Sequence, residues 1–228
     1  MGLPGIASAG LINGGFESPQ FGQTPTINVW GSGPRAYSVE DQYVDGWQTT
    51  DKGIEIWQSG FNGVTSYEGK QHAEINAYTN GTLFQDIDGI GAGLGMGFRF
   101  AHRARSGWDK MALTITDLGA DGIFGNQDDS TLFSSTYTTD TSAWALYSSN
   151  EAIGTLGNTV RFAFAAISTG SGNLSIGNFL DAAEFSVIST FSEESPALPE
   201  PGVPALMAFG LLALLGAVRR HSRRHERL

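Results

Sequence analysis

VRFAFAA, at residues 160–166, decides the fold class, because Val160, Phe162 and Phe164 alternate with smaller or charged side chains. A period of two places such residues on one face of a β-strand. The same alternation recurs at Met111, Leu113 and Ile115, at Phe98 and Phe100, and at Ala183, Phe185 and Val187. Clusters of glycine, asparagine and aspartate separate these segments, and no segment before Val203 keeps a helical period beyond about two turns. We therefore predict an all-β protein, an antiparallel β-sandwich.

The composition suits one folded domain with appended segments. Of 228 residues, 31 are glycine and only 16% are charged, which suits short strands joined by turns better than long helices. The apolar fraction of 40% is sufficient for a hydrophobic core. The chain has no cysteine, which excludes disulfides, thiol catalysis and cysteine-based zinc sites.

Charge is distributed unevenly along the chain. The net charge is −10, yet the last ten residues hold five arginines. Without the residues from Glu200 onward, 8 basic and 21 acidic side chains remain, a net charge of −13. A body this acidic repels nucleic acid phosphates, so no nucleic acid partner is expected. It suits calcium, neutral polymers or simple solubility.

The C-terminus has three parts in a fixed order. Pro-Glu-Pro at residues 199–201 is extended, because proline fixes φ and disfavours a helix in the residue before it. Residues 203–218 follow without a charge and are marginal for a spanning helix, which needs roughly 20 residues. An arginine cluster begins at residue 219, and the positive-inside rule places it in the cytoplasm.

This order resembles the PEP-CTERM sorting signal of Gram-negative bacteria, over residues 199–224. The residues that carry the resemblance are Pro199, Glu200, Pro201, Arg219 and Arg220. It implies recognition by an exosortase, a membrane protease, after transient anchoring in the inner membrane by a single C-terminal hydrophobic helix. The body would then be handed to the cell surface or the extracellular matrix. A plain single-span anchor is the alternative.

The N-terminus lacks the basic start and the apolar run of a full signal peptide. Ala-Ser-Ala at residues 7–9 matches a small-residue cleavage pattern, so residues 1–10 are interpreted as a signal-peptide remnant or a disordered peptide. We expect the β-sandwich domain at residues 11–190, a proline-bearing linker at 191–199 and the sorting tail at 200–228.

Short motifs follow one another along the body: LINGGFE at 11–17, VDGWQTTD at 44–51, IEIW at 54–57, SYEGKQHAEINA at 66–77 and GNFLDAAEF at 177–185. In this order they resemble the jelly-roll carbohydrate-binding modules of the galactose-binding-like fold. The resemblance covers nearly the whole body. It implies a jelly-roll β-sandwich whose partner is an extracellular polysaccharide, in the exopolysaccharide matrix of a biofilm-forming bacterium.

The resemblance also implies a structural Ca²⁺ ion. In such modules a glutamate of the opening strand, an acid of the closing strand and loop carbonyls hold the ion, and these correspond to Glu17, Asp181 and residues 68–70. Calcium prefers about six to eight oxygen ligands and would join the first and last strands of a domain without disulfides. Ala182 stands where the pattern often has a second acid, so one ligand is missing. Ordinary acids at strand edges are the alternative.

A second candidate calcium site is DLGADGIFGNQDDS, residues 117–130. Its acids are Asp117, Asp121, Asp128 and Asp129. Glycines let such a loop turn its oxygens inward, although the spacing is not that of an EF-hand. A polar hairpin tip explains the same residues equally well.

The candidate sugar-binding residues combine aromatic rings with carboxylates, amides and guanidinium groups, which are the groups that bind sugars. They are Glu55, Trp57, His72, Glu74 and Asn76, on shared faces of two predicted strands, and His102, Arg103, Arg105 and Trp108, in a predicted basic loop. The alternative is that the tryptophans belong to the core and the charged residues only cover the sheet. Trp47, in a Gly-Trp corner, is expected inside the core.

We therefore expect a non-catalytic carbohydrate-binding protein of the cell envelope or extracellular matrix. A structural matrix protein without a small ligand is one alternative. A polysaccharide hydrolase that uses Glu55 and Glu74 as its acid pair is another. The sequence contains no nucleophile elbow, metal-binding histidine pair or phosphate-binding loop to support catalysis.

Overall fold

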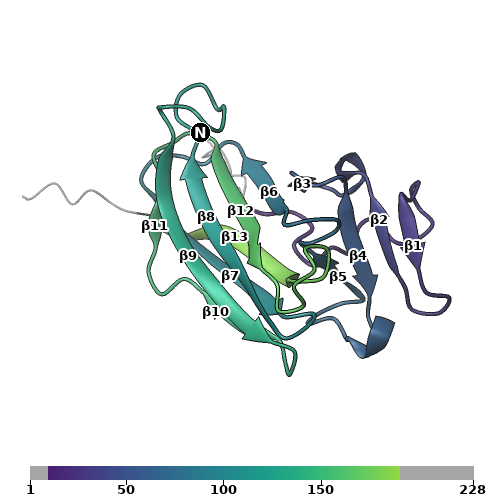
Figure 1. Cartoon of the computed structure of the whole chain (residues 1–228). Helices are drawn as coiled ribbons and strands as arrows, with labels where there is room; N and C mark the ends of the chain where they lie inside the picture. Colours follow the sequence, from purple (N-terminus) through teal and green to yellow (C-terminus); the bar gives the residue numbers. More distant parts are fainter. Residues whose placement is uncertain (1–9, 191–228) are drawn as a thin grey trace, which may run out of the picture. The chain divides into compact units, whose positions relative to one another are not determined.

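The computed structural model describes residues 10–190, which form two antiparallel β-sheets packed around one core (Figure 1). Sheet A comprises β1 (Asn28–Trp30), β2 (Ala36–Val39), β4 (Ile54–Gln58), β5 (Gln71–Glu74), β7 (Leu94–Arg103), β10 (Ala145–Ser148), β11 (Ile153–Gly154) and β13 (Phe179–Thr190). Sheet B comprises β3 (Gln48–Thr49), β6 (Thr82–Ile87), β8 (Trp108–Asp117), β9 (Ser130–Asp140) and β12 (Val160–Ser168). Two 3-10 turns, η1 (Asp41–Tyr43) and η2 (Phe61–Gly63), lie in loops. The prediction of an all-β antiparallel sandwich is confirmed.

The strands of each sheet do not follow the order of the sequence. Sheet A runs β1-β2-β4-β5-β13-β7-β10, with β11 also paired to β7, and sheet B runs β3-β6-β12-β8-β9. The strands β1 and β2 lie at one end of the structure, and β9 and β10 lie at the other (Figure 1). The last strand, β13, lies in the middle of sheet A, between β5 and β7.

Alternating side chains fill the space between the sheets. The predicted inward residues of β7, β8 and β12 are buried: Phe98, Phe100, Met111, Leu113, Ile115, Val160, Phe162 and Phe164. The period-two pattern therefore predicted the core face of these strands correctly. Trp47 is also buried, as expected, and stacks on Phe16 with ring centroids 4.9 Å apart.

Residues 11–17 form no strand, although the LINGGFE motif predicted an opening strand there. Asn13 and Phe16 have φ angles of 51° and 55°, which lie outside the β region. The segment still runs beside β13, because the Ala183 N–H donates to the Gly14 carbonyl at 3.0 Å. A Cβ at position 14 would overlap the Ala183 carbonyl oxygen, so this close approach requires glycine.

Several predictions concern residues outside the described range. These are the interpretation of residues 1–9, the linker and the sorting tail with its C-terminal helix. Among residues 10–190, no helix has the length and apolar character needed to cross a membrane.

Candidate functional site

The candidate residues of β4 and β5 lie on the outer face of sheet A. Glu55 pairs with Glu74 and Trp57 pairs with His72 in the antiparallel register, so the four side chains share a face, as predicted. The expectation that this face meets solvent is wrong. Glu55 is 4% exposed, and the other three are exposed by 1% or less.

A second, smaller core covers this face of sheet A. Trp57 packs edge-on against Phe61 and Phe179, with ring centroids 4.7 Å apart in each pair. Trp144 lies 6.3 Å from Phe179, and Val64 also packs against this cluster. The Trp57 ring is therefore buried by Phe61 of the neighbouring η2 turn together with Phe179 of the remote strand β13. Trp57 is a core residue here, so it offers no ring face on which a sugar would stack.

Arg105 holds the two acids of this face in place. Its Nη1 donates to both carboxylate oxygens of Glu74, at 2.9 and 2.8 Å, and its guanidinium carbon lies 4.7 Å from the centre of the Trp57 ring. The Trp57 Nε1 in turn donates to Glu55 Oε1 at 2.7 Å. Glu55 and Glu74 are directly opposite each other in the register, so their carboxyl groups lie side by side. Four side chains thus form one continuous network.

The environment changes the protonation of both acids. Burial raises the pKa of Glu55 to about 7, and the Trp57 hydrogen bond and the Arg105 charge oppose this rise. Burial, and after it the charge of Glu55, raise the pKa of Glu74 well above its usual value. Neighbouring carboxyl groups titrate as a pair, and here the pair retains protons to a higher pH than free glutamates do. Protonation lowers the negative charge that Arg105 offsets.

Asp109 positions the loop that carries Arg105. Asp109 is fully buried, its Oδ2 accepts the Arg105 N–H at 2.8 Å, and its Oδ1 accepts the Gly170 N–H at 2.8 Å. The carboxylate therefore ties the β7–β8 loop to the loop before β13. Asp109 is not among the residues predicted from the sequence. The available signal is an acid at an inward position of β8, two residues before Met111.

The candidates Asn76 and His102 belong to a buried network at the ends of β5, β7 and β13. Asn76 Oδ1 accepts the backbone N–H of Asn178 at 3.1 Å and its Nδ2 at 2.9 Å. His102 Nε2 lies 3.0 Å from Asn178 Oδ1, and burial lowers the pKa of His102 to about 4. Both candidates are fully buried, so the expectation that they face a ligand is wrong in this structure.

The remaining candidates do not come together. His72 is buried, its Nδ1 lies 3.0 Å from Ser66 Oγ, and burial lowers its pKa to about 3. Arg103 lies on β7 and donates to the Thr141 carbonyl at 2.7 Å. Trp108 begins β8 and is 63% exposed. The predicted basic loop is therefore only residues 104–107, because β7 extends to Arg103.

A pocket of about 250 Å³ opens beside the acid pair. This pocket, termed the Arg105 pocket, is lined by Trp30, Glu55, Phe61, Asn62, Ala77, Arg105, Ser175 and Ile176. The three hydrogen bonds that the Arg105 side chain makes to described residues all use Nη1, so Nε and Nη2 can donate to a ligand. Sequence reasoning found Glu55 and Arg105 but missed Trp30, Phe61 and Asn62.

The first predicted calcium ligands do meet. Glu17 Oε1 accepts the backbone N–H groups of Lys70 and Gln71, at 2.6 and 2.9 Å. Asp181 Oδ2 accepts those of Tyr67 and Glu68, at 2.8 and 3.1 Å. Both acids therefore bind the predicted loop. They do so through its N–H groups, whereas the resemblance implied its carbonyl groups.

A third acid lies beside these two. A Cβ at Gly15 would lie 3.4 Å from Glu68 Oε1, 3.8 Å from Asp181 Oδ1 and 3.9 Å from Glu17 Cγ. Burial raises the pKa of Asp181 to about 7, and the charge of Glu68 adds to the rise. These oxygens fit a hard cation such as Ca²⁺. Within residues 10–190, however, no three acid or histidine side chains have the spacing of a metal site. Calcium binding here stays a prediction.

The acidic loop between β8 and β9 is a hairpin tip whose acids bond its own backbone. Asp121, Asp128 and Asp129 accept the N–H groups of Ile123, Ala120 and Gly125, at 2.9, 2.9 and 2.6 Å. Asp117 is buried and accepts the Gly119 N–H at 3.0 Å. These bonds agree with the hairpin interpretation. Calcium binding by this loop stays a prediction.

Comparisons with known proteins give solved structures with low similarity and no family. No protein-family model matches the chain, and no curated protein matches it. A family 61 carbohydrate-binding module solved with β-1,4-galactotriose matches with 15% identity, over 77% of this chain and 95% of its own, at a TM-score of 0.44.

Two further solved structures are also carbohydrate-binding modules. The C-terminal family 22 module of Clostridium thermocellum Xyn10B has 15% identity over 64% of this chain and 89% of its own, at a TM-score of 0.46. A family 22 xylan-binding domain of Paenibacillus barcinonensis Xyn10C has 11% identity over 67% and 98%, at a TM-score of 0.46. At such identities and TM-scores, these likenesses do not show what this chain binds.

Proposed function

We propose that the protein binds carbohydrate without catalysis, and that the Arg105 pocket is its binding site. The supporting observation is that one open pocket joins two aromatic rings, Trp30 and Phe61, to the Glu55 carboxyl, the Arg105 guanidinium and the Asn62 amide. Aromatic rings pack on the C–H faces of sugars, and planar polar groups bond their hydroxyls. Trp30 is 38% exposed, so its ring is accessible to such a ligand.

The charge balance of the pocket favours a neutral sugar. The raised pKa values of Glu55 and Glu74 lower the negative charge of the pair near neutral pH, and Arg105 offsets the charge that remains. The body around the pocket is strongly acidic, with a net charge of −13 before Glu200, and this charge repels acidic polysaccharides at a distance. A neutral polysaccharide is therefore the partner that we propose.

The geometry of the acid pair argues against a hydrolase. A glycosidase acid pair flanks the scissile bond, so both carboxyl groups must reach the bound sugar. Glu74 is fully buried and does not line the Arg105 pocket, and Arg105 Nη1 binds both of its oxygens. Glu74 is therefore not placed to act on a sugar in this pocket.

The proposed setting is the cell surface or extracellular matrix of a Gram-negative bacterium. It is supported by the sequence alone: Pro-Glu-Pro at residues 199–201, an uncharged segment and a terminal arginine cluster. In this proposal an exosortase cleaves near the motif after transient anchoring in the inner membrane. Mass spectrometry of the exported protein tests it. A mature chain that ends near residue 200 is expected, and an exported chain that still ends at Leu228 contradicts it.

An array of neutral oligosaccharides tests the binding proposal, and xylohexaose and β-1,4-galactotriose are sensible first probes. Trp30→Ala and Asn62→Gly alter exposed residues of the pocket, and glycine keeps the left-handed backbone that Asn62 has at φ 48°, so the fold should survive. We expect Trp30→Ala to weaken binding about tenfold, and Asn62→Gly about threefold to tenfold. Trp108→Ala, an exposed tryptophan outside the pocket, should bind normally. Folded wild-type protein that retains no sugar contradicts the proposal.

A further inference from the structure

A larger cavity lies at the other end of the sandwich. It encloses about 860 Å³ between the inner side of β9, β10 and residues 148–154. It shares no lining residue with the Arg105 pocket. Both strands are sheet edges, since β9 ends sheet B and β10 ends the path of sheet A. The cavity, termed the β9–β10 groove, is therefore the open side of the sandwich.

Aromatic rings form the wall of the β9–β10 groove. Tyr137 of β9 and Tyr147 of β10 have ring centroids 4.6 Å apart, and both line the groove. Each also packs against Phe100 in the core, at 5.0 and 5.4 Å. Phe133 lines the same groove and packs against Phe98 at 5.0 Å. The core therefore holds these half-buried rings in fixed positions beside an open space.

The rim of the groove is mostly polar and carries no cation. The exposed lining residues form this rim: Leu146, Ser148, Asn150, Glu151 and Gly154. Among all the lining residues there is no lysine, arginine or histidine. Burial raises the pKa of both Tyr137 and Tyr147, so their hydroxyls stay protonated at neutral pH. The absence of cations and the presence of Glu151 disfavour an anion, and the polar rim disfavours a purely apolar ligand.

We propose that the β9–β10 groove is a second glycan site, which takes a neutral pyranose chain. Tyr147 and Tyr137 supply the ring surface, and Asn150 and Glu151 supply hydrogen-bond partners for the hydroxyls. This inference rests on the proposed function, because both sites take the same class of ligand. The groove shares no lining residue with the Arg105 pocket, however, so sugar binding at the groove does not depend on sugar binding at the pocket.

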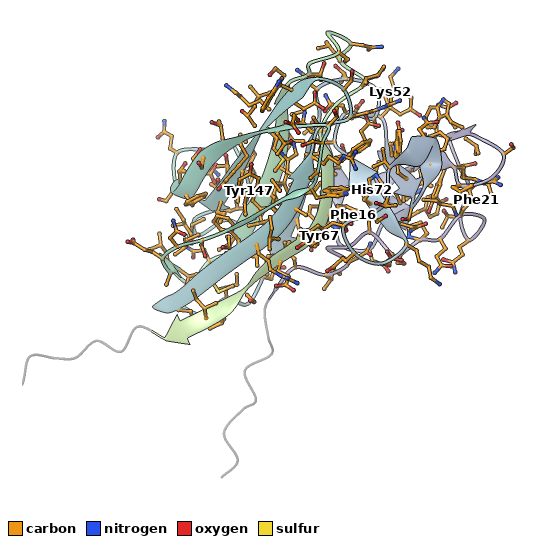
Figure 2. All side chains as sticks on the ribbon, turned by 90° about the horizontal axis from the view of Figure 1, so that it is seen from below. Phe16, Phe21, Lys52, Tyr67, His72 and Tyr147 are labelled. Atoms are coloured by element: carbon orange, nitrogen blue, oxygen red, sulfur yellow. The ribbon has the colours of Figure 1, made fainter. Side chains whose placement is uncertain are left out.

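Two separate sites on one chain change how the protein binds a long polysaccharide. Glu55 lies on β4 and Tyr147 on β10, and four interstrand steps in sheet A separate these strands, or about 19 Å. Figure 2 shows Tyr147 well to one side of His72. His72 lies on β5, the strand that also carries Glu74 of the acid pair. A short oligosaccharide occupies one site at a time, whereas a polymer is held at both. The protein thereby binds polymers with avidity and joins neighbouring chains of a matrix.

Nuclear magnetic resonance of the full-length protein tests this proposal, in a detergent without a sugar headgroup. The probes are glucose, galactose, mannose and xylose at high concentration, followed by xylohexaose. We expect saturable shifts of the backbone amides of residues 147–151, in addition to shifts around Asn62 in the Arg105 pocket. Shifts at 147–151 alone would support the groove and contradict the pocket. Shifts around Asn62 alone would leave the pocket standing and overturn the groove, and no shifts at either would overturn both.

Matched variants locate the effect within the groove. Asn150 and Glu151 are exposed, so Asn150→Ala and Glu151→Gln should fold normally. Each is expected to weaken binding at the groove about threefold to tenfold, with the Arg105 pocket unchanged. Trp108→Ala is the control that alters an exposed aromatic elsewhere. If Tyr147→Phe and the rim variants change the self-association of the protein but no sugar shift, the groove is a contact between copies and the proposal fails.

Discussion

Glu55 on β4 and Glu74 on β5 lie directly opposite each other, and the Arg105 guanidinium binds Glu74 at 2.8 Å. Buried carboxyl groups are costly unless they are paired or protonated, and here Arg105 and the raised pKa of both acids reduce that cost. The pair therefore couples the stability of the domain, and the polarity of the Arg105 pocket, to pH.

Replacement of Glu55 tests this coupling. Burial raises the pKa of Glu55 in the folded state from 4.5 to about 7, so the folded state binds a proton more tightly than the unfolded chain. The contribution of Glu55 to the free energy of unfolding is thus fully present below pH 4.5 and is lost as pH rises toward 7. We expect the free energy of unfolding of the wild type, measured by urea denaturation, to fall relative to that of Glu55→Gln as the pH rises from 4.5 to 7.

A matched control uses an exposed acid. Glu184 is paired with Arg99, and that hydrogen bond lowers the pKa of Glu184. The difference in free energy of unfolding between wild type and Glu184→Gln should therefore change with pH in the opposite direction, and only slightly. A Glu55→Gln difference in the free energy of unfolding that stays constant between pH 4.5 and 7 would contradict the raised pKa of Glu55.

Arg105 should matter far more to stability than Arg99, although both pair with a glutamate. Arg105→Met leaves the fully buried Glu74 without its cation and should cost about 3–5 kcal/mol in the free energy of unfolding. Arg99→Met breaks an exposed pair and should cost about 0.2–1 kcal/mol. The double variant Arg105→Met, Glu74→Gln should recover part of the loss. Equal effects of the two arginine variants in urea denaturation would refute the buried network.

The two candidate tryptophans should behave oppositely. Trp57→Ala removes a fully buried ring from the smaller core and is expected to lower the free energy of unfolding by about 3–5 kcal/mol. Trp108 is mostly exposed, and Trp108→Ala should change that energy by less than about 0.5 kcal/mol. Chemical denaturation distinguishes them. A mild effect of Trp57→Ala would mean that the loops do not cover this face in solution.

These contrasts show what the sequence determines and what it does not. Alternation identified the core residues of β8 and β12, because a strand buried on one face carries a period of two. Alternation also placed Glu55 with Trp57, and His72 with Glu74, correctly. It says nothing about the cover on the outer face of sheet A. Part of that cover comes from residues distant in sequence, such as Trp144 and Phe179, so side chains predicted to meet solvent proved to be buried.

The binding surfaces themselves were harder to predict. Trp30, Phe61 and Arg105 meet only after the sheet is assembled, since β1, η2 and the β7–β8 loop are far apart in sequence. Tyr137 and Tyr147 lie in segments rich in serine and threonine, and such sequences are typical of ordinary edge strands. The calcium motif predicted the meeting of Glu17 with Asp181, but it did not predict that these acids would bind loop N–H groups.

Calcium is expected to stabilise the protein through Glu17, Glu68 and Asp181. At free calcium about 100-fold above the Kd, the melting temperature should exceed that in chelator by about 5–10 °C. Asp181→Asn should remove most of this difference, and Asp128→Asn in the β8–β9 hairpin should leave it unchanged. The reverse result would move the site to the hairpin. Identical melting with calcium and with chelator would exclude both sites.

The most direct measurement is calorimetric titration of a neutral oligosaccharide into wild-type protein, Trp30→Ala and Trp108→Ala, at equal concentrations of folded chain. The account predicts saturable heat for the wild type, about tenfold weaker binding for Trp30→Ala and no change for Trp108→Ala. Equal affinities of wild type and Trp30→Ala, or no heat with any neutral sugar, would contradict carbohydrate binding at the Arg105 pocket.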